Sequence, residues 1–584
     1  MKSFFKGVLA SVAGVFIAFL ILVICFSIVV INSSSPRNYK LEDNTILSIR
    51  LSGILKDHAQ PNPIMQYLGF SDVDEISQSD IVSAIKKAKE NDKVKGIYIY
   101  SSYLSASNAS LLEIRNELND FRKSGKFIIA YADTYMQGCY FLSSVADKVI
   151  LNPSGNLDLH GLASSRVFYK GLFDKLGVEV QVFKVGTYKS AVEPYMLDKM
   201  SPANREQVGS YIHDIWNTML AGISQSRNIS VSELDSIANM MPLFREPQMV
   251  VDKGLADTLM YETEVKDYLC ALTDAEKPDD LKLVSVKQMA SVKSEKKEHK
   301  EKVAVLYAEG SIVSGNAKTD INDRFVIKQL EKLKDDEDVK AVVLRVNSGG
   351  GSAYASEQIW KAVTDLKVKK PIVVSMGGYA ASGGYYISCN ASKIIAQPNT
   401  LTGSIGIFGL FPNVEGLAQK AGLTFDHVKT NRFADFGDLA RPMREDEKVI
   451  LQEYIDKGYD LFITRCAEGR GISKDSIAKI AEGRVWTGNQ ALKIGLVDAI
   501  GGIDMAIEEA AKFAELKEYS VSEYPKQKSF WENLTFDIRN TIAQETLKSY
   551  LGDDYRLIKT VREIKEMTEQ DFIQARLPYD FEIK

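Results

Sequence analysis

The sequence is poor in the residues that build metal centres and disulfide frameworks. Among its 584 residues there are only five cysteines and five histidines. No two cysteines form a CxxC pair, one of them lies in an apolar N-terminal run, and no two histidines have metal-ligand spacing. These absences argue against a zinc ribbon and a disulfide framework, so we expect no metal site. The residues are Cys25, Cys139, Cys270, Cys389 and Cys466, with His58, His160, His213, His299 and His427.

The chain also lacks an excess of positive charge. Its formal net charge is -5, so we expect no nucleic acid partner. Hydrophobic residues make up 45% and charged residues 26% of the chain, which is ordinary for a globular protein. A chain of this length is too long for a single core, so the sequence predicts two large domains.

One long apolar run lies at the N-terminus. The segment Gly7–Ile31 is uncharged and mostly apolar, and it follows Lys2 and Lys6. As a helix with a rise of about 1.5 Å per residue it would span roughly 37 Å, enough to cross a bilayer with some tilt. The run exceeds the apolar core of a cleaved signal peptide, which is about 7–15 residues. We therefore predict one N-terminal transmembrane helix in a retained membrane anchor, residues 1–40, with cleavage near Ser33–Ser35 as the alternative.

The charges that flank this run predict its orientation. Positive residues before the span favour a cytoplasmic N-terminus, although Arg37 and Lys40 after it oppose this orientation. We expect a single-pass protein whose folded domains lie on the extracytoplasmic side of the membrane.

The most informative feature is an internal repeat. Residue n of the first half resembles residue n + 245 of the second half, without a gap, from Val94 to about Lys189. A fixed offset predicts two copies of one folding unit, and the positions where the copies differ in chemistry are candidates for function. Matching positions are Tyr140 and Tyr385, Lys148–Ile150 and Lys393–Ile395, Pro153 and Pro398, and Gly177 and Gly422.

Strand-like segments mark where the two copies begin. They are Thr45–Leu55 and Lys302–Val313, and the charge-dense segment Ser291–Lys302 between them is interpreted as a solvated linker. The expected units are a first domain over residues 45–290, a second over 303–522, and a C-terminal helical tail of unknown role over 523–584.

Inside each copy, short apolar runs alternate with amphipathic stretches of helix length. This alternation predicts βαβ units and a largely parallel sheet, so the predicted fold class is α/β. The predicted strands are Ala341–Val346, Ile372–Ser375, Lys393–Ala396 and the AGLTFDHV segment, residues 421–428. The predicted helices are Ser356–Leu366, Ser382–Asn390, Ala203–Ser224 and Arg444–Ala467.

Ser382 is a candidate nucleophile. It stands between Ala380-Ala381 and Gly383-Gly384, just after an apolar strand, so a substrate backbone can approach it closely. A serine at the start of a helix lies beside free backbone N–H groups and the positive end of the helix dipole. The N–H of Gly383 is then placed to donate to a developing oxyanion. The alternative is that these small residues only permit close helix packing.

A glycine-rich turn offers the second oxyanion donor. The segment Arg345–Ala353, RVNSGGGSA, ends an apolar strand in three glycines, whose backbone N–H groups can point into a site without obstruction. A phosphate site is the alternative, but neither GxGxxG nor GKS or GKT is present. We expect Gly350 or Gly351 to face Ser382.

The candidate base is a lysine rather than a histidine. His427 lies in the predicted strand 421–428 and is more often a packed or surface residue there. Lys189, in TYKSAVEP, has small and apolar neighbours. To act as a base near neutral pH its pKa must fall by roughly 3 units from about 10.4, which burial can supply.

The repeat supports this pairing. At the offset of 245, Ser382 matches Gln137 and Lys189 matches Ala434. The second copy thus holds a nucleophile without the lysine, and the first copy holds the lysine without a nucleophile. Two packed domains can complete one site. The further matches are Gly350-Gly351 with Ser105-Ala106, and Ser404, in TLTGSIG, with Leu159.

These motifs resemble those of the long, tandem-repeat form of bacterial signal peptide peptidase A, also called protease IV. The resemblance covers nearly the whole chain and lies in VGTYKSAVEP, RVNSGGGSA, YAASGGYYI and LTGSIGIFG. It implies a Clp-protease/crotonase fold built as a spiral of ββα units. It also implies Ser382 as nucleophile, Lys189 as general base and Ser404 as the serine that hydrogen-bonds the lysine. One departure is Gly349, where the family pattern has proline.

The resemblance also implies a function and an assembly. Family members digest leftover signal peptides and form a bowl-shaped homotetramer anchored in the bacterial cytoplasmic membrane. We therefore expect a serine peptidase that acts on apolar peptides without a cofactor. Two other functions remain as alternatives, a crotonase-type acyl-CoA enzyme and a membrane scaffold without catalysis.

Overall fold

The computed structural model describes residues 7, 13–18, 21, 39–59, 75–293, 298–315, 321–526 and 573–577. Within these ranges, no helix has the length and apolar character needed to cross a membrane. The predicted membrane span, residues 7–31, lies mostly outside the described residues.

The described strands form three sheets, two of which are large and mainly parallel. The first contains β1 (Thr45–Lys56), β2 (Glu75–Ser77), β3 (Val94–Ser105), β4 (Phe127–Tyr135), β5 (Lys148–Leu157), β7 (Thr258–Leu259) and β8 (Leu283–Ser285). The second contains β9 (Lys302–Glu309), β12 (Val339–Ser348), β14 (Ile372–Ala381), β15 (Lys393–Ala396), β16 (Leu401–Gly403), β18 (Val485–Thr487), β19 (Ala499–Ile500) and β20 (Ser520–Tyr524).

Helices accompany each large sheet. Those of the first copy are α3 (Gln78–Glu90), α4 (Asn108–Arg122), α5 (Gln137–Ser143), α6 (Lys170–Leu176), α7 (Glu193–Met196), α8 (Pro202–Arg227), α9 (Val231–Ala238), α10 (Pro247–Asp252), α11 (Glu262–Thr273) and α12 (Val286–Ala290). Those of the second copy are α13 (Asp323–Asp335), α14 (Ala353–Lys369), α15 (Gly383–Ser388), α16 (Glu415–Lys420), α17 (Glu445–Arg470), α18 (Lys474–Ile480), α19 (Gly488–Lys493) and α20 (Ile503–Phe513).

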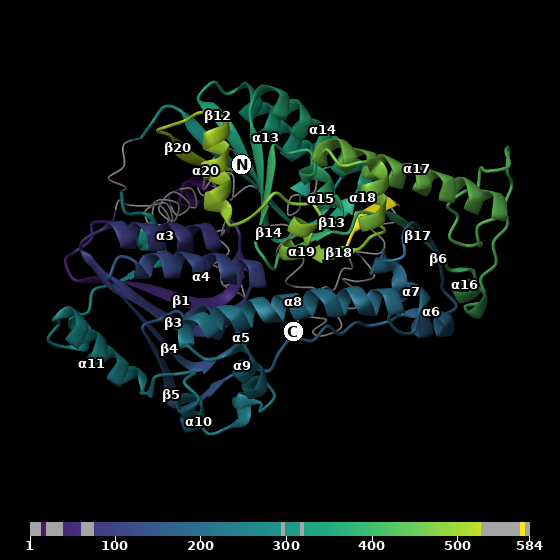
Figure 1. The fold of residues 1–584 in the computed structure, drawn as a ribbon. Helices are drawn as coiled ribbons and strands as arrows, with labels where there is room; N and C mark the ends of the chain where they lie inside the picture. Colours follow the sequence, from purple (N-terminus) through teal and green to yellow (C-terminus); the bar gives the residue numbers. More distant parts are fainter. Residues whose placement is uncertain are drawn as a thin grey trace.

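The structure contains the predicted duplication. The pairs β3 and β12, β4 and β14, β5 and β15, α3 and α13, and α4 and α14 each begin 245 residues apart. Two tyrosines at that offset also make the same contact, because Tyr140 Oη donates to the carbonyl of Leu255 and Tyr385 Oη to that of Leu496, both at 2.9 Å. The fold is therefore an α/β fold in two copies, which lie one above the other in Figure 1.

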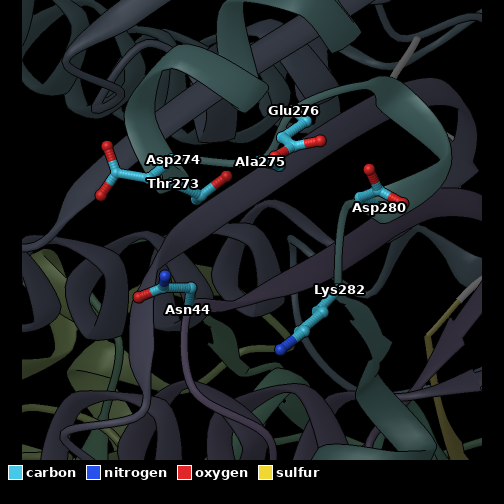
Figure 2. Close-up of a pocket in the computed structure, with 7 residues that line it drawn as sticks. All are labelled: Asn44, Thr273, Asp274, Ala275, Glu276, Asp280 and Lys282. Atoms are coloured by element: carbon cyan, nitrogen blue, oxygen red, sulfur yellow. The ribbon is translucent and has the colours of Figure 1, made fainter.

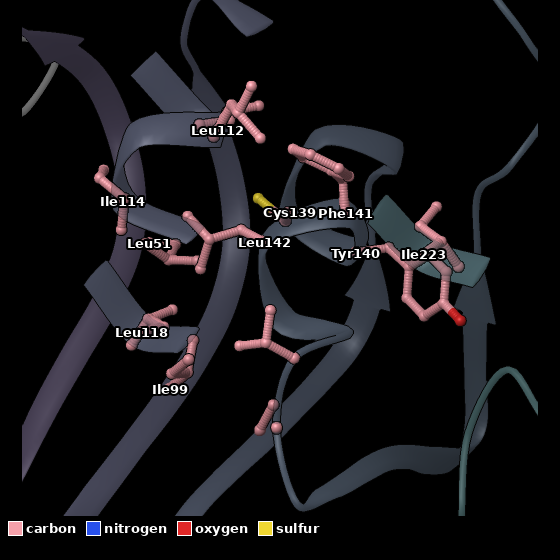
Figure 3. Close-up of a cluster of buried hydrophobic side chains, with 14 of the residues drawn as sticks. Leu51, Ile99, Leu112, Ile114, Leu118, Cys139, Tyr140, Phe141, Leu142 and Ile223 are labelled. Carbon is pink, nitrogen blue, oxygen red and sulfur yellow. The ribbon is translucent and has the colours of Figure 1, made fainter. Parts of the chain in front are cut away.

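The core of the first copy explains the alternation of apolar runs and amphipathic stretches in the sequence. Apolar side chains of β1, β3, α4, α5 and α8 meet in one buried cluster (Figure 3). Strands that are covered on both faces need long apolar runs, whereas the helices contribute one apolar face each. The cluster includes Leu51, Ile99, Leu112, Ile114, Leu118, Cys139, Tyr140, Phe141, Leu142 and Ile223.

A third sheet combines strands from both copies. It contains β11 (Ile321–Asn322), β10 (Ile312–Val313), β13 (Gly350–Ser352), β21 (Ile573–Arg576), β17 (Phe408–Asn413) and β6 (Glu179–Lys184), in that order. β6 of the first copy is antiparallel to β17 of the second. This pairing carries the segment that follows β6, including Lys189, into the second copy.

A buried ion cluster joins the copies. Arg345 on β12 contacts Asp57 at 3.0 Å (Nε to Oδ2) and Glu113 on α4 at 2.8 Å (Nη2 to Oε2). The arginine is 2% exposed. Because charges removed from water must be paired, this contact constrains how the two copies sit against each other.

Most of the predicted elements are confirmed, and two segments differ. The predicted strand 421–428 is wrong: these residues form a turn and irregular chain, and His427 pairs with Asp438 at 3.3 Å. No described strand pairs with this segment, and β17, the strand before it in the chain, pairs with β6 and β21. In the C-terminal tail that was predicted to be helical, residues 573–576 form strand β21, and residues 527–572 lie outside the described part.

Candidate active site

Ser382 lies at the junction between β14 and α15. Its backbone has φ 56° and ψ −114°, a region that non-glycine residues rarely adopt. Its amide donates to the carbonyl of Gly403 at 2.7 Å, which holds this tight bend. Strain of this kind persists only where the surroundings enforce it. The side chain is fully buried.

Lys189 reaches Ser382 within the same chain. Its Nζ lies 2.8 Å from Ser382 Oγ, although the residues are 193 positions apart. The lysine is 1% exposed. The candidate nucleophile and the candidate base thus meet within one chain, a point that the sequence left open. A distance of 2.8 Å is within the range that direct proton transfer requires.

The second copy holds the backbone around Lys189 in place. The amide of Tyr188 donates to the carbonyl of Glu482 at 2.9 Å. Gly483 lies so close that a Cβ there would be 2.7 Å from the Lys189 backbone. Gln207 on α8 links both sides, since its Nε2 donates to the Tyr188 carbonyl and its Oε1 accepts from the amide of Val485. The lysine is therefore fixed before any substrate binds.

Burial alters the acidity of Lys189. Removal from water disfavours the charged ammonium and lowers the pKa of Lys189 from 10.5 to about 7. The ring of Phe408 lies 5.9 Å from Nζ and forms part of the apolar surroundings. At neutral pH an appreciable fraction of this lysine is uncharged and able to accept a proton.

Ser404 lies on the other side of the lysine. Both its hydroxyl and its carbonyl oxygen are 3.2 Å from Lys189 Nζ. Its amide donates to the carbonyl of Arg484 at 2.7 Å, which holds it in its φ of 49°. With Ser382, these contacts give the amine three oxygen neighbours and a defined direction.

The glycine turn lies against Ser382, and the structure separates the roles of its glycines. The amide of Gly350 already donates to Ser348 Oγ at 3.1 Å, and its φ of +99° forms the turn. The next residue, Gly351, lies on β13, where a Cβ would be only 2.0 Å from the carbonyl oxygen of Ile312. Gly350 thus shapes the turn, and the backbone N–H groups of Gly351 and Gly383 stay the candidate oxyanion donors.

The matching site in the first copy is filled. Gln137, at the position of Ser382, donates from Nε2 to the carbonyl of Gly161 at 3.0 Å. Its Oε1 accepts from the amides of His160 and Gly161, also at 3.0 Å. These bonds tie the Gln137 amide to the backbone, and a glutamine provides no nucleophile at that position.

Several residues that complete the site were not predicted from the sequence. The carbonyl of Gly406 lies 3.4 Å from Ser382 Oγ, and Glu482, Gly483 and Gln207 position the lysine. Gly406 stands within the LTGSIGIFG motif, which offered a signal. The other three lie outside the motifs, and the fold brings them to the site.

A polar surface pocket of about 230 Å³ lies away from this site (Figure 2). All of its lining residues belong to the first copy, and none belongs to the serine site. Among the described residues, no group of His, Cys, Asp and Glu side chains has the arrangement of a metal site. The pocket residues are Asn44, Thr273, Asp274, Ala275, Glu276, Asp280 and Lys282.

Comparison with known proteins agrees with the duplication. Residues 120–276 and 364–517 match the model described as Peptidase family S49, once in each copy, and residues 294–402 match Clp protease. The chain is 33% identical to Protease 4 of Haemophilus influenzae over 95% of this chain and 94% of that protein. It is 38% identical to Protease 4 of Salmonella typhi, covering 82% and 80%. It is 29% identical to the chloroplastic serine protease SPPA of Arabidopsis thaliana, covering 84% and 72%.

Together, the fold and these matches define a serine peptidase with a Clp-protease-like α/β fold in two copies. The two matches to the same peptidase model and the two long bacterial relatives then make the assignment specific. The chain belongs to peptidase family S49. The resemblance to signal peptide peptidase A that its motifs indicated is thereby confirmed.

Proposed function

We propose that this chain is a membrane-anchored serine endopeptidase in which Lys189 activates Ser382. The observation that carries the proposal is the 2.8 Å contact between Lys189 Nζ and Ser382 Oγ inside a fully buried site. A lysine with a pKa of about 7 provides the base that a serine nucleophile needs near neutral pH.

The proposed reaction follows from these contacts. Uncharged Lys189 removes the hydroxyl proton of Ser382, whose Oγ attacks a peptide carbonyl carbon. The amides of Gly383 and Gly351 stabilise the resulting oxyanion. Lys189 then delivers the proton to the leaving amine, and water hydrolyses the acyl-enzyme by the reverse proton path. Ser404 holds the lysine in the direction of Ser382 throughout.

The test is a peptidase assay on the purified full chain. We expect Ser382→Ala and Lys189→Ala each to lower kcat/KM for an apolar peptide by about 10³-fold or more, as the removal of a nucleophile or base does in serine peptidases. Ser101→Ala, a change at a buried serine of the first copy that bonds Ser143, should leave the rate unchanged. Wild-type kcat/KM should rise with pH through about 7, as Lys189 loses its proton. Full activity in folded Lys189→Ala protein would exclude the lysine as base.

Anchoring and substrate class form the second part of the proposal. The apolar run of residues 7–31 supports an anchor that places the site at the surface of the cytoplasmic membrane, on its extracytoplasmic side, where cleaved signal peptides are released. We expect the full chain to stay with membranes under alkaline carbonate extraction and to hydrolyse synthetic signal peptides faster than polar peptides of equal length. Release of the chain by carbonate would contradict the anchor, and equal rates on the two peptides would contradict the substrate class.

We also propose that the chain forms a homo-oligomer, with a tetramer expected from the family resemblance. The arm that carries α6 and α16 has solvent-exposed apolar side chains, including Leu172, Phe425 and Val428. Exposed apolar groups that gather on one region favour contact with another protein surface. Light scattering on the detergent-solubilised chain should give a mass near four protomers, and a monomer at micromolar concentration would contradict this part.

A further inference from the structure

Arg484 lies in the turn before β18, at the boundary between the two copies. Its carbonyl accepts a hydrogen bond from the amide of Ser404, whose hydroxyl contacts Lys189 Nζ. Its side chain extends to the first copy, where α8 packs against β18 (Figure 1). One residue of the second copy thus contacts both Ser404 and the segment that carries Lys189.

The guanidinium of Arg484 holds the side chain of Tyr188, the residue before Lys189. Its Nη1 donates to Tyr188 Oη at 3.1 Å, and its Cζ lies 4.7 Å from the centroid of the Tyr188 ring. Its Nη2 lies 3.0 Å from Oε1 of Glu206 on α8. Tyr188 Oη in turn donates to Glu206 Oε2 at 3.3 Å. Each of these three side chains therefore contacts the other two, across the boundary between the copies.

The second copy gives this guanidinium a fixed support. The Cζ of Arg484 lies 4.5 Å from the ring of Trp486 on β18. The indole is itself held, because its Nε1 donates to the carbonyl of Ile480 at 3.0 Å and β18 pairs with β16, the strand that ends just before Ser404. A planar guanidinium can stack on aromatic rings and donate hydrogen bonds at the same time. Arg484 therefore links a paired strand of the second copy to the lysine segment of the first.

We propose that Arg484 is a positioning residue for Lys189: its side chain clamps Tyr188 and Glu206 to the second copy and so keeps the lysine enclosed beside Ser382. This inference rests on the proposed function of Ser382 and Lys189. Arg484 acts through Tyr188 and is not itself catalytic. Its bond to Ser404 comes from the backbone, which any residue at position 484 supplies, so side-chain variants test the clamp alone.

The clamp affects the acidity of Lys189 as well as its position. Tyr188, Arg484 and Trp486 are each partly exposed, whereas Lys189 is 1% exposed. Burial lowers the pKa of Lys189 to about 7. Water that reached Nζ would stabilise the ammonium and return this pKa towards 10.5. Loss of the clamp should therefore change the pH dependence of the reaction and not only its rate.

Peptidase kinetics on the full chain from pH 6 to pH 10 test the proposal. We expect Arg484→Gln to lower kcat/KM for an apolar peptide by about 10²-fold at pH 7, the typical effect of misplacing a catalytic group by about 1 Å. The rise of kcat/KM with pH should move upwards from about 7, so the deficit should be smaller at pH 9. Arg484→Lys should show the same shift, because it keeps the charge but lacks the planar fork.

Arg465→Gln is the matched control, because Arg465 makes the same kind of contacts within the second copy alone. Its Cζ lies 3.8 Å from the ring of Trp360, and its Nη2 lies 2.7 Å from Oε1 of Glu357. Its side chain is 25% exposed, against 21% for Arg484. We expect this variant to keep the wild-type kcat/KM and the wild-type pH profile.

Acetylation of Lys189 measures the clamp without peptidase activity. The proteins are treated with acetic anhydride at pH 10, and the peptide that contains Lys189 is followed by mass measurement. We expect labelling to be about tenfold or more faster in Arg484→Gln than in wild type or Arg465→Gln, because a buried amine reacts only when its surroundings open. If Arg484→Gln protein does not fold, Glu206→Gln replaces it, with a smaller change in the same direction expected from a carboxylate that is 57% exposed.

Two outcomes would overturn the clamp. One is wild-type labelling of Lys189 together with a wild-type pH profile in folded Arg484→Gln protein. The other is a loss of rate that is the same at every pH and equal in Arg465→Gln. Full activity of folded Lys189→Ala protein would instead overturn the proposed function, and the labelling would then still decide whether Arg484 holds the lysine.

Discussion

At the scale of single residues, Lys189 is both the proposed general base and a buried amine whose charged form destabilises the fold. Burial lowers its pKa to about 7, against 10.5 for a lysine in water. The same desolvation that makes it a base near neutral pH destabilises the folded chain whenever the amine is protonated. Burial of Lys189 therefore favours the proposed activity and lowers the stability of the folded chain.

We predict that Lys189→Met stabilises the folded protein in a pH-dependent way. Between pH 7 and 10.5 the unfolded chain binds more protons at Lys189 than the folded chain, so wild-type stability rises with pH across this window. Below pH 7 Lys189 is protonated in both the folded and the unfolded chain. The folded wild type then carries the full desolvation cost of the ammonium, a few kcal/mol at roughly 1.4 kcal/mol per pKa unit. The advantage of the methionine variant should be greatest at pH 6 and shrink towards pH 10.

Urea unfolding at a series of pH values measures this difference. Lys517→Met changes an exposed lysine and is the matched control, for which we expect no pH-dependent gain. An advantage of Lys189→Met that stayed constant from pH 6 to pH 10 would show that the lysine does not titrate in the folded state with a lowered pKa.

At the scale of elements, the site depends on short connections rather than on the long strands and helices. β14 ends just before Ser382, β16 ends just before Ser404, and the turn before β18 carries Gly483 against Lys189. The large sheets position these ends, and the bends between elements set the direction of each functional group. A small change in such a bend should therefore affect the rate more than the stability.

Gly483→Ala tests this dependence. A Cβ at Gly483 would lie 2.7 Å from the Lys189 backbone, so the lysine must move. We expect kcat/KM to fall by about 10²-fold, the typical effect of misplacing a catalytic group by about 1 Å. Gly437→Ala is a matched control, since its φ is also positive, at +83°, and no heavy atom lies within 4 Å of its Cβ.

Both alanine variants should lose a similar stability of about 1–2 kcal/mol, the cost of a left-handed backbone for an L-residue. Thermal unfolding of the two proteins measures the backbone strain that both share. Peptidase kinetics measures the displacement of Lys189, which we expect only in Gly483→Ala. Equal activity of Gly483→Ala and Gly437→Ala would show that the turn does not position the lysine.

At the scale of the whole molecule, duplication allowed the two halves to divide one site between them. The second copy keeps the serine and its glycines, while the first copy supplies the lysine through the pairing of β6 with β17. Arg345 of the second copy and the carboxylates of Asp57 and Glu113 of the first fix how the halves meet. A site of this kind requires both copies in a fixed arrangement.

Because the two functional groups meet within one chain, we predict that inactive chains do not rescue each other. Lys189→Ala and Ser382→Ala proteins, mixed at equal concentration and incubated to exchange subunits, should show no more peptidase activity than either protein alone. Wild type mixed with Ser382→Ala should retain the activity of its wild-type share, and this mixture is the control for damage during exchange. Recovery in the first mixture would show that Lys189 serves the serine of a neighbouring chain.

Much of this protein could be predicted from its residues. The offset of 245 indicated the two copies because duplicated units keep their spacing, and the alternation of apolar runs indicated an α/β fold because buried strands and helices have distinct periods. The differences between the copies and the motifs that resemble those of a known family predict a site at Ser382, Lys189 and Ser404, which the fold brings together.

Other features depend on contacts between residues distant in sequence, and only the tertiary structure decides them. Whether Lys189 meets Ser382 of its own chain depends on how β6 pairs with β17, which no local pattern encodes. Gly351 is distinguished from Gly350 as an oxyanion donor because Ser348 already binds the Gly350 amide. The segment 573–577 carries no motif, and its place in the third sheet follows from pairing with β13 and β17, which are distant in sequence.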